Sequence, residues 1–215
     1  LLKQGRGSDA LASWNAGLVE SGARVIVVRH AWIRSHADRF GDLYGAIGGT
    51  AGVLRFECDV PLPDEDAVSV DTVSAAFSAR LERVEQRERD RGVTLAGPHR
   101  DDVALLMATA EGDVDLRQFG SGGQKRTAAI ALRMIEAETV RHARGFQPLL
   151  LLDDVFAELD PGRSRRILEL LSGSRHGQVV LTAPKESDVL IDELVADGVV
   201  APLARWRIAA AAVTT

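Results

Sequence analysis

The sequence predicts an α/β fold built on a parallel sheet, and three stretches of the chain support this prediction. Residues 149–152 are four consecutive leucines, an apolar run typical of a strand buried on both faces of a parallel sheet. Apolar residues at helical spacing follow at 162–171, and a second apolar run comes after them at 178–182. A strand, a helix and a strand in this order form a parallel crossover. We therefore expect the sheet in the second half of the chain.

Two acids, Asp153 and Asp154, follow the leucine run directly. They fall at the C-terminal end of the expected strand, where open α/β sheets place their ligands. One carboxylate there supplies a hard oxygen ligand for a nucleotide-bound Mg²⁺, and the second can orient or deprotonate water. This is a Walker B pattern. The alternative is a buried strand followed by an acidic loop that caps the next helix.

A glycine-rich stretch, Ser121-Gly122-Gly123-Gln124, opens a long helical pattern upstream of the two acids. The N–H groups of a first helical turn and the positive end of the helix dipole form an anion site. Glycines let the backbone approach a phosphate without a clash at Cβ. The stretch therefore predicts a phosphate contact, and a plain helix cap is the alternative.

This stretch superficially resembles a Walker A loop, but it is not one. A Walker A loop ends in Gly-Lys-Ser/Thr, whereas here Gln124 precedes Lys125 and Arg126 follows it. No other stretch of the sequence supplies Gly-x-x-x-x-Gly-Lys-Ser/Thr. The principal phosphate cradle, with its lysine and its Mg²⁺-binding hydroxyl, is therefore missing from these 215 residues.

A third stretch, residues 97–102, reads Gly-Pro-His-Arg-Asp-Asp. Its two basic side chains, His99 and Arg100, could reach a phosphate. The alternative is a turn in which Arg100 pairs with Asp101 or Asp102.

The remaining periodicity predicts further helices and strands. Trp14 and Trp32 fall at helical spacing, which favours packing over stacking on nucleic acid bases. In the first half of the chain we expect one helix from 8 to about 47, capped by Ser8-Asp9, or two helices interrupted near Gly22; a half-buried strand at 52–60; and a helix capped by Asp71, whose polar end at 85–91 is solvated or packs only weakly. Further along we expect a short strand at 93–96; a hairpin of 103–108 and 114–119; a short helix at about 189–196; a last strand at 199–208; and a frayed end at 209–215.

Composition narrows the class of protein. The chain is 46% hydrophobic and 27% charged, which suits a globular fold, and no apolar run approaches the length of a membrane span. The formal net charge of −5 does not indicate nucleic-acid binding, so any DNA site must be a local basic patch. The single cysteine, Cys58, excludes an internal disulfide and suits the cytosol. Because the sequence starts at Leu1 and not at Met, we expect it to come from a longer protein.

Taken in series, the three motifs resemble those of the RecF family, recombination-mediator ATPases related to the SMC proteins. The resemblance runs from about Ser8 to about Thr182, and its motifs lie between Gly97 and Asp160. It implies a P-loop NTPase fold: the signature and Walker B half of an ABC-type ATPase head at 93–215, with residues 1–92 forming part of a helical lever lobe.

The resemblance also implies cofactors and roles for individual residues. ATP and Mg²⁺ would be bound, and ATP would drive dimerisation of the heads. Ser121 and the backbone of Gly122 and Gly123 would close over the γ-phosphate held by the other subunit. Asp153 would bind Mg²⁺, and Asp154 would position or activate the attacking water.

The remaining residues receive roles from the same resemblance. Asp160 and its loop would cross the dimer interface, and Thr182 would lie near Asp153, where many ABC-type proteins carry a histidine. Contacts to nucleotide or DNA could be added by three neighbours in the signature stretch, Gln124, Lys125 and Arg126.

The implied function is DNA replication, recombinational repair and the SOS response in the cytoplasm. A homodimer closed by ATP would bind single-stranded and gapped DNA and recruit recombination mediator proteins, away from any membrane. Without a Walker A loop, these 215 residues alone should not hydrolyse ATP. A non-catalytic interaction scaffold is the alternative. A nucleotide-binding half of an ABC transporter is disfavoured by the stretch 97–102 and by the long helical insert.

Overall fold

The computed structural model divides into two compact units. Unit 1 comprises Leu1–Asp38 and Val53–Leu106, and unit 2 comprises Arg39–Gly52 and Met107–Thr215. The structure describes residues 8–62, 64–173, 177–184, 195, 204, 206–209 and 212–214.

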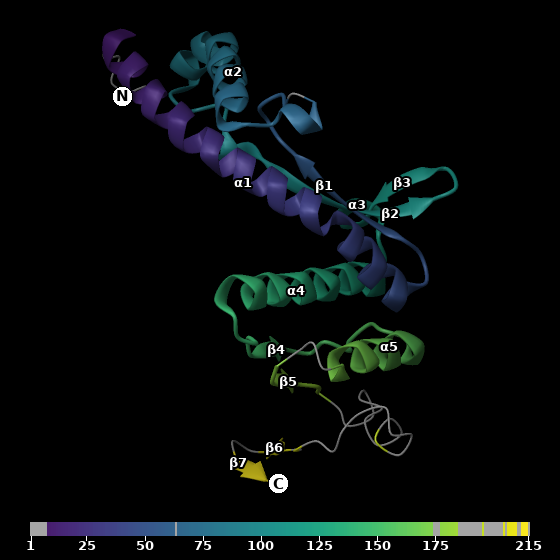
Figure 1. The fold of residues 1–215 in the computed structure, drawn as a ribbon. Helices are drawn as coiled ribbons and strands as arrows, with labels where there is room; N and C mark the ends of the chain where they lie inside the picture. The colour runs from purple at the N-terminus through teal and green to yellow at the C-terminus, as the bar shows by residue number, and fades with distance from the viewer. Residues whose placement is uncertain are drawn as a thin grey trace. The chain divides into compact units, whose positions relative to one another are not determined.

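The described residues form a mixed α/β structure (Figure 1). In chain order the elements are α1 (Ser8–Gly48), β1 (Gly52–Glu57), η2 (Glu65–Ala67), α2 (Val70–Arg91), η3 (Pro98–Arg100), β2 (Asp102–Thr109), β3 (Gly112–Asp115), α3 (Leu116–Phe119), α4 (Gly122–Arg144), β4 (Leu150–Leu152), α5 (Pro161–Ser172), β5 (Val179–Leu181), β6 (Arg207–Ala209) and β7 (Ala212–Thr214).

The first helix, α1, is a single helix of 41 residues, so the alternative of two helices interrupted near Gly22 is wrong. It ends as predicted at a glycine pair: Gly49 has φ +81°, and its N–H donates to the carbonyl of Gly45 at 2.8 Å. A left-handed residue at this place satisfies a helix carbonyl, and glycine adopts that conformation without a steric penalty.

The core of unit 1 is built around Phe77, which is fully buried. A Cβ on Gly22 would lie 2.6 Å from its ring, and a Cβ on Gly97 would lie 2.7 Å from it. Both glycines therefore make room for the aromatic ring. The cluster consists of Val19, Ala23, Ile26, Val60, Val73, Phe77, Leu81, Val84 and Ala96.

The start of α2 differs from the prediction. Ser69, and not Asp71, caps the helix, because its hydroxyl accepts the N–H of Thr72 while the Thr72 hydroxyl accepts the N–H of Ser69. This reciprocal capping box satisfies two N–H groups at once. Asp71 instead lies in the first turn, where its charge favours the helix dipole. The helix ends at the predicted Gly92, which has φ +64°.

The polar end of α2 is mostly exposed, as predicted, except at Glu88. Glu88 is buried, and its carboxylate accepts the N–H of Leu95 at 2.6 Å. Around it the predicted i,i+4 pairs are present: Arg89 with Glu85 at 2.5 Å, and Gln86 with Asp90 at 2.9 Å. A buried carboxylate that receives a backbone donor fixes the chain after the helix.

The strand predicted at 93–96 is also wrong, and those residues form a bend. Backbone N–H groups in and next to this segment donate to carboxylates and not to a neighbouring strand. The N–H of Leu95 donates to Glu88, and the N–H of Gly97 donates to Asp59 at 3.3 Å. The predicted hairpin is present as β2 and β3, in a sheet of order β1-β2-β3.

The second half of that hairpin is shorter than predicted. Asp115 accepts the N–H groups of Arg117 and Gln118 at 2.6 and 3.1 Å, which starts the short helix α3. An aspartate in this position competes with a continuing strand for the backbone donors.

Unit 2 contains the predicted parallel pair, in which β4 pairs with β5 and Leu151 lies opposite Val180. The leucine run is buried on only one face. Leu150 and Leu152 are 9% and 7% exposed, whereas Leu149 and Leu151 are 53% and 65% exposed. Among the described residues nothing covers the second face, so burial on both faces was wrongly predicted.

The end of α1 is bound to the helices of unit 2. Arg39 forms a two-oxygen ion pair with Glu138 of α4, with its shortest distance 2.7 Å, and this pairing raises the pKa of Arg39. Arg166 of α5 donates to the carbonyl of Ile47 at 3.0 Å. Phe40, Leu43, Tyr44 and Ile47 are buried on this segment.

Three further predictions concern single residues and the end of the chain. Trp14 is 68% exposed, so its predicted packing is wrong within the described residues, whereas Trp32 stacks on His36 with ring centroids 4.6 Å apart. The helix predicted at 189–196 lies outside the described residues, apart from residue 195, which is helical. β6 overlaps the end of the strand predicted at 199–208 and pairs antiparallel with β7, which lies where a frayed end was predicted.

No helix in the described part of the chain is long and apolar enough to cross a membrane.

Candidate nucleotide site

The two Walker B acids lie immediately after β4, as predicted. Thr182 lies immediately after the neighbouring strand β5, and its N–H donates to the carbonyl of Leu152 at 3.0 Å. Its hydroxyl donates to Oδ1 of Asp153 and accepts the N–H of Asp154 at 3.0 Å. The predicted proximity of Thr182 and Asp153 is confirmed, and the threonine holds both acids at the end of the sheet.

Asp154 has a left-handed backbone, with φ +47°. Its Oδ1 is buried and has no hydrogen-bond partner in the structure. A buried carboxylate oxygen of this kind is rare, because desolvation without a donor is unfavourable. An oxygen held in this way is suited to accept a hydrogen bond from a water molecule or a ligand.

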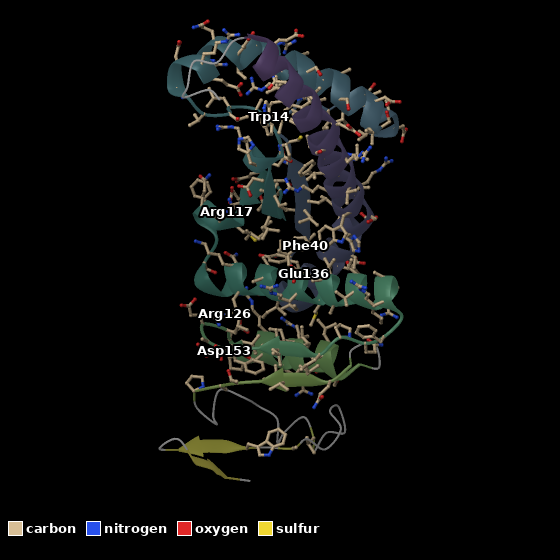
Figure 2. All side chains as sticks on the ribbon, turned by 90° about the vertical axis from the view of Figure 1, so that its left-hand side faces the viewer. Trp14, Phe40, Arg117, Arg126, Glu136 and Asp153 are labelled. Atoms are coloured by element: carbon tan, nitrogen blue, oxygen red, sulfur yellow. The ribbon has the colours of Figure 1, made fainter. Side chains whose placement is uncertain are left out.

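The backbone of Asp154 is also bound from the opposite side, by α4. Arg126 is half-buried, and its Nη1 donates to the carbonyl of Asp154. Figure 2 shows Arg126 and Asp153 at the same end of unit 2. The two backbone groups of Asp154 are thus held by two side chains, one from α4 and one after β5.

The glycine-rich stretch begins α4, as predicted. Ser121 is the N-cap: its hydroxyl accepts the N–H of Gln124 at 3.3 Å, and Oε1 of Gln124 accepts the N–H of Ser121 at 2.8 Å. The amide of Gln124 also contacts Sδ of Met107 at 3.4 Å. Ser121 and Gln124 therefore form a helix cap, and the phosphate contact stays a prediction. Ser121, Gly122 and Lys125 are exposed to solvent.

The first turn of α4 packs against the loop after the Walker B acids. A Cβ on Gly122 would collide with the carboxylate of Glu158, and a Cβ on Gly123 would lie 2.9 Å from the carbonyl of Glu158. Glu158 has φ +63°, a backbone conformation that residues other than glycine rarely adopt. No contact was predicted for Glu158, because the spacing of the glycines does not indicate which distant side chain they meet.

Asp160 caps α5. Its carboxylate accepts the N–H of Arg163 at 3.0 Å and pairs with the Arg163 guanidinium at 3.3 Å. The hydrogen bond from that backbone N–H, followed by the charge of Arg163, lowers the pKa of Asp160. Pro161 occupies the first turn, as predicted.

The stretch 97–102 lies in unit 1 and is organised by ion pairs. The Asp101 side chain is only 2% exposed; it accepts Nη1 of Arg29 at 3.1 Å and the N–H of Asp59 at 3.2 Å. Arg29 also donates to the carbonyl of Pro98 at 2.6 Å. The stretch does contain an ion pair, but Asp101 pairs with Arg29 of α1 and not with Arg100 as the alternative predicted.

The two basic residues of this stretch, Arg100 and His99, also have partners within unit 1. Arg100 lies 3.8 Å from Asp59, which also binds Nη2 of Arg80 at 3.0 Å, and His99 contacts the carbonyl of Thr94 at 3.3 Å. No role was predicted for Asp59, and the only signal for it was the alternation of charges along the strand expected at 52–60, which ends before Asp59 in the structure. The phosphate contact predicted for His99 and Arg100 stays a prediction.

The donor set at the end of β4 fits the chemistry of a Mg²⁺–nucleotide site. Among the described residues no group of three or more His, Cys, Asp or Glu side chains could hold a metal ion by itself. Mg²⁺ keeps several waters and is bound by one or two carboxylates together with substrate phosphates. Asp153 and Asp154 supply such carboxylates, and the orphaned Oδ1 of Asp154 is an acceptor without a donor.

Comparisons with known proteins agree with the motifs. No protein-family model matches the chain. DNA replication and repair proteins RecF from Salinibacter ruber and Frankia alni are 34% and 38% identical to it, each over 82% of the chain. RecF from Geotalea daltonii is 34% identical over 90% of the chain.

Solved structures give the same result. The structure of the recombination mediator protein RecF with ATPγS in the RecFOR pathway matches 88% of this chain with a TM-score of 0.71 and 29% identity. The corresponding structure with ATP matches 86% of this chain with a TM-score of 0.66 and 28% identity.

The chain spans about half the length of the proteins it matches. It covers 42%, 46% and 51% of the three curated relatives, and 50% and 48% of the two solved chains.

Proposed function

The chain belongs to the RecF family of DNA replication and repair proteins, with the P-loop ABC-type fold of that family, and on this premise we propose that it works as the signature and Walker B half of an ATP-dependent dimeric head. The three motifs in series support this proposal, as do the matching structures that contain ATP or ATPγS. The division into a lever lobe at 1–92 and a head at 93–215 is part of the proposal.

One observation carries the proposal: the Ser121 end of α4 and the loop of the two acids form one bonded assembly within unit 2. Arg126 binds the carbonyl of Asp154, and the first turn of α4 packs on Glu158. A helix start that presents N–H groups to an anion and a pair of carboxylates that suits a metal are the two complementary parts of a nucleotide site.

Each residue has a distinct role in the proposed head. The exposed Ser121 and the backbone of Gly122 would contact the γ-phosphate held by the second subunit, since a helix N-terminus binds anions. Asp153 would bind Mg²⁺, which supplies charge neutralisation at the phosphates when bound. Asp154 would orient or deprotonate the attacking water, and Thr182 would hold both acids in place.

Dimerisation would place the loop of Asp160 at the interface between the heads. The closed dimer would bind single-stranded and gapped DNA and recruit recombination mediators in the cytoplasm during recombinational repair and the SOS response. The membership of the RecF family supports this part of the proposal. Gln124 and Lys125 would add contacts to nucleotide or DNA from the exposed start of α4.

The experiment measures association of the fluorescently labelled 215-residue chain with the intact RecF-type protein of the same organism, by sedimentation velocity with and without ATPγS and Mg²⁺. We expect the chain to enter a larger complex only when nucleotide is present. The chain alone should show no Mg²⁺-dependent ATP turnover.

The informative variant is Ser121→Asp. Aspartate caps a helix as well as serine does, so the fold should be retained, whereas its charge repels a phosphate. Ser78→Asp, on the exposed face of α2, is the matched control. Loss of association in Ser121→Asp alone supports the proposal. Equal association with and without ATPγS would favour the scaffold function, and ATP turnover by the chain alone would contradict the proposal.

A further inference from the structure

We propose that Arg126 is a positioning residue that fixes the backbone of Asp154 and so couples the Ser121 end of α4 to the water-activating carboxylate of the same chain. This inference rests on the proposed function, because it assigns Arg126 a part in the turnover of ATP. It differs from the expectation that Arg126 contacts nucleotide or DNA directly.

The geometry around Asp154 supports the coupling. Arg126 follows Ser121 in the first turns of α4, and its Nη1 donates to the carbonyl of Asp154. On the other side of the same residue, the N–H of Asp154 donates to the hydroxyl of Thr182 at 3.0 Å. Both backbone polar groups of Asp154 are therefore occupied by side chains from distant parts of the sequence.

The backbone conformation explains why this support matters. Asp154 has φ +47°, in the left-handed region that residues other than glycine adopt uncommonly, although aspartate and asparagine do so more readily than most. Such a conformation persists where surrounding contacts hold it in place. The carbonyl of Asp154 also accepts the N–H of Ala157 at 3.4 Å, close to the limit for a hydrogen bond. Without the bond from Arg126, only this weaker contact would restrain rotation of the peptide after Asp154.

The Oδ1 atom of Asp154 contributes no hydrogen bond that would fix the orientation of the carboxylate. That oxygen is buried and has no hydrogen-bond partner, so no donor fixes its direction. The orientation of the carboxylate is consequently set through the backbone. Because a bond from a charged guanidinium is stronger than one between neutral groups, the bond from Arg126 is the strongest of the three hydrogen bonds to the backbone of Asp154.

The coupling has a consequence in the proposed dimer. Ser121 of one chain would contact the nucleotide held by its partner, while Asp154 of that chain would act on the nucleotide in its own site. Arg126 joins the two elements that serve these separate sites. A shift of the first turn of α4 on nucleotide contact would reach the Asp154 carbonyl directly through the Arg126 side chain, whereas the packing of Gly122 and Gly123 on Glu158 meets the same loop four residues later.

The test uses the intact RecF-type protein that contains this segment, with ATP turnover measured against ATP concentration. Arg126→Met keeps the aliphatic stem but removes the donor, and Arg126→Lys restores a charged donor. We expect Arg126→Met to lower kcat by roughly 10-fold to 100-fold, the effect of losing one hydrogen bond from a charged group. KM for ATP and ATPγS-dependent association should change by less than about twofold, and Arg126→Lys should recover most of kcat.

The decisive comparison is made in the Asp154→Asn background. Asparagine tolerates the left-handed conformation and removes the charge, so Arg126→Met should add less than about twofold to the loss already present. Arg133→Met, also on α4 but in an exposed pair with Glu136, is the control that should leave kcat within about twofold.

The outcomes separate this inference from the proposed function. A raised KM with unchanged kcat would assign Arg126 to direct nucleotide contact and overturn the inference, and so would fully additive losses of kcat in the double variant. If the parent protein shows neither turnover nor ATPγS-dependent association, the proposed function fails and this inference, which rests on it, fails with it. If the parent turns over ATP, Arg126→Met and the Arg126→Met, Asp154→Asn double variant together decide the inference.

Discussion

Replacing Gly123 by alanine should destabilise unit 2, whereas the same change at the neighbouring Gly122 should not. The added Cβ at Gly123 would lie 2.9 Å from the carbonyl of Glu158 and 2.8 Å from Nη1 of Arg163. Gly123 is buried, and the Glu158 backbone is already in a left-handed conformation, so this carbonyl has little freedom to retreat. At Gly122 the Cβ would meet only the exposed, rotatable carboxylate of Glu158.

Two contributions to the free energy of unfolding, helix propensity and overpacking, have opposite signs here. Alanine stabilises a helix relative to glycine by roughly 0.5–1 kcal/mol, and overpacking a tight contact costs about 1–3 kcal/mol. Gly123→Ala should therefore lose up to about 2.5 kcal/mol, and Gly122→Ala should gain up to about 1 kcal/mol. For a chain of this size each kcal/mol moves Tm by about 2–4 °C.

The assay is thermal and urea unfolding of the 215-residue chain, followed by circular dichroism. Gly17→Ala in α1 is the control, because a Cβ there meets nothing within 4 Å. We expect Tm to fall for Gly123→Ala and to stay equal or rise for the other two variants. A Gly123→Ala chain at least as stable as the Gly122→Ala chain would refute the packing of α4 on Glu158.

Three further predictions test other parts of the structure. Phe77→Ala should cost about 3–5 kcal/mol, since it empties a fully buried site between two glycines; urea denaturation measures this, and a loss below about 1 kcal/mol would contradict the assigned core. Burial, together with the nearby Asp101 charge, raises the pKa of the Cys58 thiol from 9.0 to about 12, so at pH 8 iodoacetamide should label the folded chain roughly a thousandfold more slowly than the urea-unfolded chain; equal rates would show that the thiol is accessible. Because the pKa of Asp160 is lowered on folding, its contribution to stability is complete above the ordinary aspartate pKa and disappears as the pH falls through the lowered value; the Tm gap between wild type and Asp160→Ala should therefore narrow towards pH 2, and a gap that widens on acidification would be inconsistent with the cap.

Much of the architecture could be predicted from local signals in the sequence. The helical spacing of α1, the glycines after α1 and α2, and the Ser121 start of α4 are each determined by neighbouring residues, and the structure confirms them. The parallel pair and the position of Thr182 followed from strand order, because parallel strands bring their C-terminal ends to one edge.

The features that were missed depend on residues far apart in the sequence. Asp101 pairs with Arg29 across 72 positions, and Arg126 reaches Asp154 across 28. Nothing in local periodicity indicates which of many charges will meet. The cap of α2 failed for a different reason: Ser69 and Asp71 are both good caps, and the reciprocal bond with Thr72 favours the serine.

The half-covered leucine strand bears on how solutions of this chain will behave. The exposed apolar side chains of Leu149, Leu151 and Val180 form a strip along the paired strands β4 and β5. Exposed apolar strips favour concentration-dependent self-association and the binding of apolar dyes. That background association would not depend on nucleotide and would be strengthened by sulfate and weakened by low concentrations of urea. Leu151→Thr keeps the strand propensity while it shrinks the strip. A chain carrying this change gives the cleaner starting material for every association measurement proposed above.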